Sequence, residues 1–205
     1  VLSTNLIEAT WDTGAYVQTS GVLKRIAVKL SKICNDLRLL SSGPRTGINE
    51  INLPRLQPGS SIMPGKVNPV IPEVVSQVAF DIIGKDVTIT MAAEAGQLEL
   101  NVMEPIIAFS LSNGIHRLRQ AMRTLQDRCV SGITANKERC RSMVENSIGI
   151  ITALNPYLGY ETSASIAKEA LETGGSVIDI VLARNLLSRE KLDDILAPEH
   201  MINRK

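Results

Sequence analysis

A stretch of regularly spaced aliphatic residues near the start of the chain constrains its fold most strongly. Between residues 23 and 40 they recur at alternating intervals of three and four: Leu23, Ile26, Leu30, Ile33, Leu37 and Leu40. Because about 3.6 residues complete one helical turn, this spacing places all of them on one face of a helix. The pattern is typical of a long helix packed in a bundle.

Two further stretches also predict long helices. The same alternation recurs in a set that predicts a helix ending near Gly132: Ala108, Leu111, Ile115, Leu118, Met122, Leu125 and Cys129. Between the two, we expect a helix that starts at Asn68 as its N-cap, with Pro69 and Pro72 in the first turn. Its apolar residues occupy more than one face, which indicates burial among neighbouring helices.

The remainder of the chain predicts shorter helices and few strands. Beyond Gly132 the pattern predicts four short helices, separated by Gly, Asn-Pro and Ser signals: 136–146, 159–173, 176–183 and 188–196. Strand signals are weak, and aromatic residues make up only 3% of the chain, so we expect an all-α fold. We expect residues 1–135 to form part of a helical-bundle domain and residues 136–205 to form a small C-terminal helical domain.

Composition limits the classes of partner. The 205 residues include 22 basic and 21 acidic side chains, so no broad positive field favours nucleic acid or an anionic membrane. No apolar run of about 18 residues predicts a membrane span. We therefore expect a cytoplasmic protein whose partners are small molecules or other subunits. The three cysteines, Cys34, Cys129 and Cys140, lack the spacing of a zinc site and are expected to be reduced. Because the first residue is Val1, not Met, we also expect further sequence before it.

The longest irregular segment, residues 41–67, leads into the predicted helix at Asn68 and ends in a polar loop. This loop, residues 59–68, combines small residues, hydroxyls, a cation and an amide: Gly59, Ser60, Ser61, Ile62, Met63, Pro64, Gly65, Lys66, Val67 and Asn68. Backbone N–H groups before a helix, together with the charge of Lys66, can bind a carboxylate. From spacing alone, a simple turn with a solvated lysine and a capping asparagine is an equally good interpretation.

The loop resembles the signature G-S-S-x-M-P-x-K-x-N of the aspartase/fumarase superfamily at every fixed position. The resemblance extends to the segments on either side, residues 39–54 and 95–105, and covers essentially the whole chain. The wording N-E-I-N-L-P at residues 49–54 and Q-L-E-L-N-V-M-E-P at residues 97–105 is more similar to aspartases than to fumarases. The regions rich in Thr, Ser, Asn and His that complete the site in this family have no match in the chain.

The resemblance implies a reversible elimination that releases ammonia from L-aspartate to give fumarate through an aci-carboxylate intermediate. By the same resemblance, Ser60 is the catalytic base, Lys66, Asn68 and Ser61 bind substrate, and Glu73 supports the site. Met63 and Pro64 shape the loop together with Gly59 and Gly65. A serine alkoxide needs stabilisation by N–H groups and positive charge in a closed, dry loop.

The resemblance also implies a homotetramer whose core is a bundle of long helices and whose active site draws on three subunits. No cofactor is expected to be required, while activation by a divalent metal stays open. Since most substrate contacts would be missing, the chain alone is expected to be close to inactive. Two alternatives remain: a class II fumarase, which acts on malate with the same loop, and an inert helical module that only oligomerises.

Overall fold

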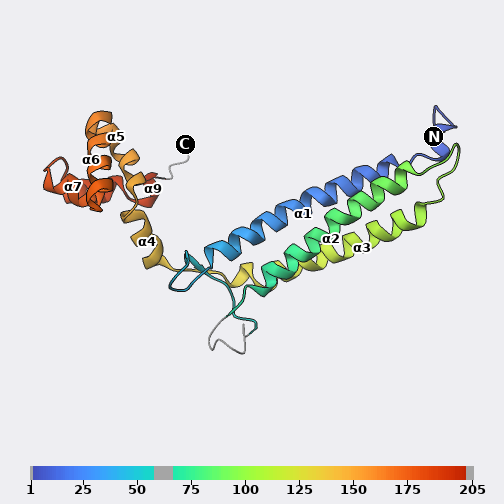
Figure 1. Cartoon of the computed structure of the whole chain (residues 1–205), viewed down its shortest axis with the longest axis horizontal. Coiled ribbons are helices and arrows are strands. Elements are labelled where there is room, and N and C mark those ends of the chain that lie inside the picture. Colours follow the sequence, from blue (N-terminus) through green and yellow to red (C-terminus); the bar gives the residue numbers. More distant parts are fainter. Residues whose placement is uncertain (1, 58–66, 202–205) are drawn as a thin grey trace. The chain divides into compact units, whose positions relative to one another are not determined.

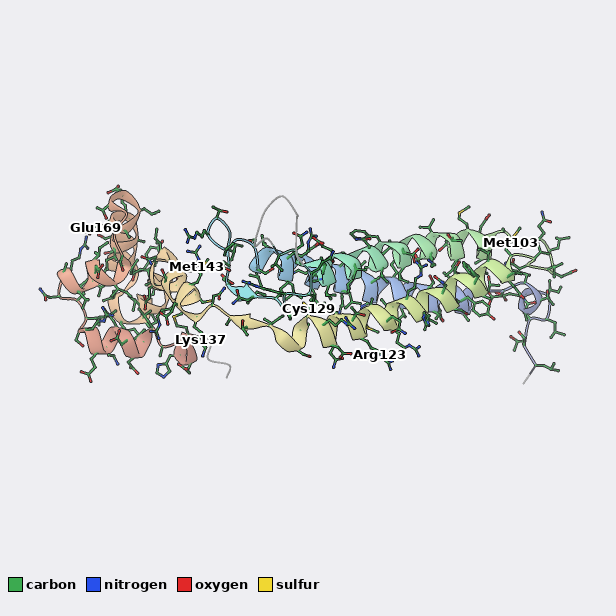
Figure 2. All side chains as sticks on the ribbon, turned by 90° about the horizontal axis from the view of Figure 1, so that it is seen from below. Met103, Arg123, Cys129, Lys137, Met143 and Glu169 are labelled. Atoms are coloured by element: carbon green, nitrogen blue, oxygen red, sulfur yellow. The ribbon has the colours of Figure 1, made fainter. Side chains whose placement is uncertain are left out.

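The computed structural model describes residues 2–57 and 67–201, which form two compact units, residues 1–135 and 136–205. Three long helices dominate the first unit and lie side by side (Figure 1): α1 (Gly14–Leu40), α2 (Val70–Glu94) and α3 (Glu104–Arg128). Met103 and Cys129 flank the two ends of α3 (Figure 2). The first unit also holds the short 3-10 helices η1 (Glu8–Thr10) and η2 (Val130–Gly132).

The three long helices pack through small and aliphatic side chains. Ala27 of α1 and Ala79 of α2 are fully buried in one cluster with Ile82 and Leu118. Small residues let two helix backbones approach closely, and each buried aliphatic side chain stabilises the fold by about 1.5–3 kcal/mol. The 3-4 periodicity of the sequence therefore correctly predicted the bundle.

A buried polar cluster interrupts this apolar packing. Asp86 of α2 is only 6% exposed, accepts a hydrogen bond from the Ser20 hydroxyl (2.7 Å) and pairs with the Lys24 ammonium group (2.5 Å). Burial alone would raise the pKa of Asp86, but the bonds from Lys24 and Ser20 outweigh it and lower the pKa. The aspartate therefore stays charged and ties α2 to α1.

A two-stranded antiparallel sheet lies at the end of the bundle where α1 finishes. Its strands are β1 (Ile51–Asn52) and β2 (Thr134–Ala135), with Ile51 opposite Ala135 and Asn52 opposite Thr134. Between α1 and β1, the Ser42 hydroxyl donates to the Leu39 carbonyl (2.6 Å) and accepts from the Ile48 N–H (3.2 Å). A side chain at Gly47 would lie 2.4 Å from the Ser42 backbone, so this turn requires glycine.

The second unit consists of short helices around its own core. These are α4 (Lys137–Glu145), η3 (Ile148–Ile150), α5 (Ile151–Leu158), α6 (Tyr160–Thr173), α7 (Val177–Ala183), α8 (Arg189–Ile195) and α9 (Pro198–Met201). Ser176 and Ser188 cap α7 and α8 by accepting hydrogen bonds from backbone N–H groups (3.2 Å each). The all-α prediction is confirmed. Among the described residues, no helix is long and apolar enough to cross a membrane.

Two details of the helix predictions were wrong. The Asn-Pro pair at residues 155–156 was interpreted as a break, but Pro156 lies inside α5. Leu154 of the same helix is fully buried in the core of the second unit, and this packing outweighs the hydrogen bond that proline removes. The third long helix begins at Glu104 and ends at Arg128, and Gly132 belongs to the separate turn η2.

Candidate active site

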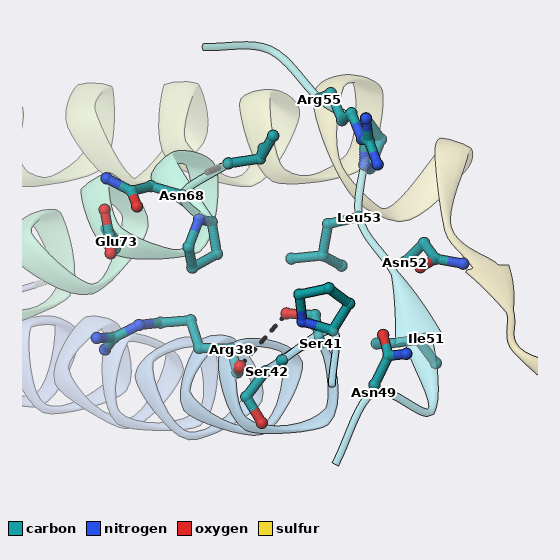
Figure 3. A pocket seen from close by; sticks show the side chains of 15 residues that line it. Arg38, Ser41, Ser42, Asn49, Ile51, Asn52, Leu53, Arg55, Asn68 and Glu73 are labelled. Carbon is teal, nitrogen blue, oxygen red and sulfur yellow. Dashed lines mark hydrogen bonds between the residues drawn. The ribbon is translucent and has the colours of Figure 1, made fainter. Parts of the chain in front are cut away.

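A polar pocket of about 510 Å³ lies where the C-terminal end of α1, the following segment and the start of α2 meet (Figure 3). All of its described lining residues belong to the first unit: Arg38, Ser41, Ser42, Gly43, Pro44, Asn49, Ile51, Asn52, Leu53, Pro54, Arg55, Val67, Asn68, Pro69 and Glu73. Most of them carry hydroxyl, amide or charged groups. Such a lining is suited to a small polar ligand.

Asn68 and Glu73, which the sequence predicted to bind substrate and to support the site, both line this pocket. They are brought together by the start of α2, where the Glu73 N–H donates to the Pro69 carbonyl (3.2 Å). In Figure 3 the Arg38 side chain, carried by α1, lies below Glu73 at the same end of the view. The other predicted site residues, Gly59, Ser60, Ser61, Met63, Pro64, Gly65 and Lys66, lie outside the described residues.

The predicted capping role of Asn68 was wrong. The helix begins at Val70, Pro69 precedes it with a non-helical ψ of 58°, and no side chain caps the first turn. It is the backbone carbonyl of Asn68, not its side chain, that accepts a hydrogen bond from the Val70 N–H (2.9 Å). Pro72 does lie in the first turn, as predicted, and is buried. Because Asn68 does not cap α2, its amide can serve the pocket instead.

The charge of the described lining favours an anion. Arg38 and Arg55 each bring a guanidinium group, whereas Glu73 brings one carboxylate. A guanidinium can form two parallel hydrogen bonds with one carboxylate, which a lysine cannot do. The charge of this lining therefore suits a ligand that carries a carboxylate.

Sequence reasoning did not identify the two arginines as candidate site residues. Arg38 lies in the last turn of α1, where the negative end of the helix dipole favours a cation. Arg55 follows β1. Both lie within or next to the segment that carries the family resemblance. Only the packing of α1 against the start of α2 brings Arg38 into the same pocket as Glu73.

Nearby thiols are poorly suited to act as nucleophiles. Burial raises the pKa of Cys34 to about 11, with a smaller contribution from Cys129, and burial also raises the pKa of Cys129. Both side chains are at most 1% exposed. Cys34 and Cys129 therefore remain protonated near neutral pH, and the chemistry of the pocket lies elsewhere.

Among the described residues, no group of three or more His, Cys, Asp or Glu side chains is placed to hold a metal ion.

Comparisons with known proteins agree with the fold. Residues 1–84 match a family model described as Lyase, and residues 150–203 match one described as Fumarase C C-terminus. The chain is 64% identical to an aspartate ammonia-lyase from Helicobacter pylori over 99% of its length, and 59% identical to one from Escherichia coli over 97%. It covers 43% and 42% of these two relatives.

Solved structures show the same relationship. A fumarate lyase:delta crystallin from Brucella melitensis, bound to cobalt, is 55% identical with a TM-score of 0.93, and the match covers 100% of this chain and 44% of that one. A class II fumarase from Schistosoma mansoni is 39% identical with a TM-score of 0.87, covering 97% of this chain and 42% of that one. The chain belongs to the aspartase/fumarase superfamily of lyases. It spans less than half the length of the curated relatives it matches.

Proposed function

We propose that this chain forms part of an aspartate ammonia-lyase, which converts L-aspartate reversibly to fumarate and ammonia. The observation that carries the proposal is the 59–66% identity to relatives of that name, sustained over 97–99% of the chain. The grouping of Asn68 and Glu73 with Arg38 in one pocket supports it, because the substrate is a dicarboxylate.

Each predicted site residue has a proposed role in the reaction. Ser60 removes a proton from the carbon next to one carboxylate, and the electron pair moves onto that carboxylate. Ser61, Lys66 and Asn68 hold the substrate and stabilise the additional negative charge, after which ammonia leaves. Glu73 orients a neighbouring group in the complete site. Gly59, Met63, Pro64 and Gly65 shape the loop so that water is excluded during the reaction.

A homotetramer built through the long helices is part of the same proposal. Large apolar side chains stand exposed on α2 and α3, including Phe80 (59%), Val87 (61%), Met91 (61%) and Phe109 (62%). Helices that leave so much apolar surface in water are typical of subunit interfaces. The proposed enzyme needs no cofactor, with activation by a divalent metal left to experiment, and is proposed to act in the cytoplasm.

A class II fumarase is the second candidate. It is favoured by the match of residues 150–203 to the model described as Fumarase C C-terminus, and by the 39% identity to a class II fumarase. The two reactions share proton removal and carboxylate stabilisation and differ in the leaving group, ammonia or water.

One assay separates the candidates. Fumarate formation is followed with the full-length protein from L-aspartate and, separately, from L-malate, and then with a Ser60→Ala variant. We expect turnover of aspartate that falls at least a hundredfold in the variant, since Ser60 is the proposed base. Turnover of malate alone would support the fumarase. No turnover of either substrate would leave the helical oligomerisation module as the interpretation.

A further inference from the structure

One short segment of the pocket wall, residues 51–54, is held by three successive contacts. Ile51 and Asn52 pair with Ala135 and Thr134 in the two-stranded sheet, and the Asn52 side-chain amide donates to the Thr134 hydroxyl (3.3 Å). Leu53 packs against the buried cluster that contains Leu125 and Cys129. All four residues of the segment line the pocket.

The third contact joins Pro54 to Gly132. A Cβ atom added at Gly132 would lie 2.6 Å from Cγ of Pro54, a distance that real Cβ atoms essentially never show. The other nearby atoms, Cβ and Cδ of Pro54, would lie at 3.6 and 3.7 Å, which are ordinary contacts. Gly132 therefore lets the turn η2 touch the ring of a pocket residue directly.

The need for glycine here is a need for space. The φ of Gly132 lies outside the left-handed region, so an alanine could adopt the same backbone conformation. The ring of Pro54 is the obstacle, and it is part of the pocket wall. Since a proline ring is rigid, an added methyl group must displace the backbone of residues 51–55 or that of the turn.

We propose that Gly132 is a positioning residue, which sets the pocket wall formed by residues 51–55 through its contact with Pro54. Its importance for catalysis rests on the proposed lyase function. The wall carries Arg55 and precedes in sequence the loop that contains Ser60. Its position therefore governs where Arg55 lies relative to a substrate in the pocket. Displacing a site by about 1 Å can slow a reaction by about a hundredfold.

The test uses the full-length protein with four variants. Gly132→Ala introduces the methyl group, and Gly132→Ala with Pro54→Ala removes the Cγ atom that it would meet. Ser131→Ala is the matched control, because it lies in the same turn and removes a hydroxyl that donates to the Gln126 carbonyl (2.9 Å), while it adds no atom at Gly132. Thr134→Val removes only the hydroxyl that accepts from Asn52.

We expect Gly132→Ala to lower kcat/KM about 10- to 100-fold, and the added Pro54→Ala change to restore at least half of that loss on a logarithmic scale. Ser131→Ala should lower the Tm while kcat/KM stays within about twofold of the unchanged protein. Equal effects of Ser131→Ala and Gly132→Ala, or no rescue by Pro54→Ala, would show that Gly132 only stabilises the turn.

Hydrogen exchange makes the test independent of the activity. In peptides that cover residues 51–57, amide exchange should be faster in Gly132→Ala and return toward the original rate in the double variant. If the unchanged protein converts neither aspartate nor malate, the proposed function fails while this measurement still decides the inference. If Gly132→Ala does not fold, Thr134→Val should accelerate the same amides about twofold to tenfold. Unchanged exchange in Thr134→Val would then overturn the proposal.

Discussion

The two units of the chain solve the problem of burying apolar surface differently. The second unit, residues 136–205, surrounds a single cluster of nine buried residues, among them Leu154, Ile166 and Leu192, each fully buried. In the part of the first unit that the structure describes, narrow apolar stripes are buried between the helices in three small clusters, and large apolar side chains stay exposed along the helices. A unit with a closed core can be stable alone, whereas exposed apolar helices need a partner.

The largest effect is expected from opening the core of the second unit. Leu154→Ala should destabilise this unit by about 2–5 kcal/mol, because the substitution leaves a cavity where the side chain is fully buried. Leu171→Ala in the same unit is the control, since that leucine is 69% exposed and should cost less than about 0.5 kcal/mol. Urea unfolding measures both. Equal costs would mean that the second unit does not depend on this core.

The next largest effect concerns the polar cluster of the first unit. Asp86→Ala should cost about 1.5–3 kcal/mol near neutral pH, because it removes charge-assisted hydrogen bonds from Lys24 and Ser20 in a buried position. Thermal and urea unfolding at pH 7 measure the loss. A change of less than about 0.5 kcal/mol would show that the cluster does not stabilise the bundle.

The same aspartate makes stability depend on pH. The pKa of Asp86 is lower in the folded protein than in the unfolded chain, so its contribution is complete above the unfolded pKa of about 3.9. The contribution disappears as the pH falls through the lower, folded pKa. Asp86→Asn should therefore flatten the decline of stability below about pH 4. A decline of unchanged steepness in the variant would contradict this assignment.

A smaller effect should follow from changing the exposed apolar face of the long helices. Phe109→Ser should weaken association by about 1–2 kcal/mol per contact, roughly a fivefold to thirtyfold change, if another copy covers this side chain. Tyr160→Ser in the second unit, where the side chain is 79% exposed, serves as a comparison and should leave association unchanged. Analytical ultracentrifugation of the full-length variants distinguishes the two. Unchanged association of Phe109→Ser would exclude this face from the interface.

The smallest effect is expected at a helix end. Ser188→Ala removes the hydroxyl that accepts from the Lys191 N–H at the start of α8 and should cost about 1 kcal/mol. Ser188→Thr keeps an acceptor and should cost less. Thermal unfolding of the second unit measures both, and an identical Tm for alanine and threonine would show that the hydrogen bond adds nothing to stability.

The sequence predicted those features best that depend on residues close together in the chain. The spacing of Leu23 to Leu40 predicted a helix because periodicity acts within a few turns, and the observed α1 contains the entire stretch. Helix ends were less predictable. Asparagine is a residue type preferred at N-caps, which is why the sequence predicted that Asn68 caps α2. The helix nevertheless begins at Val70, since the conformation of Pro69 and the packing of the bundle decide where it starts.

The sequence by itself determined the all-α class and the long helices, through residue spacing, and its family signature at residues 59–68 predicted where the site lies. Only the tertiary structure decided that Arg38, Arg55, Asn68 and Glu73 share one pocket, and that Gly132 supports its wall. The physical reason is distance along the chain. The pairing of Asn52 with Thr134 joins residues that are 82 positions apart, and no local pattern encodes a contact created by the packing of three helices.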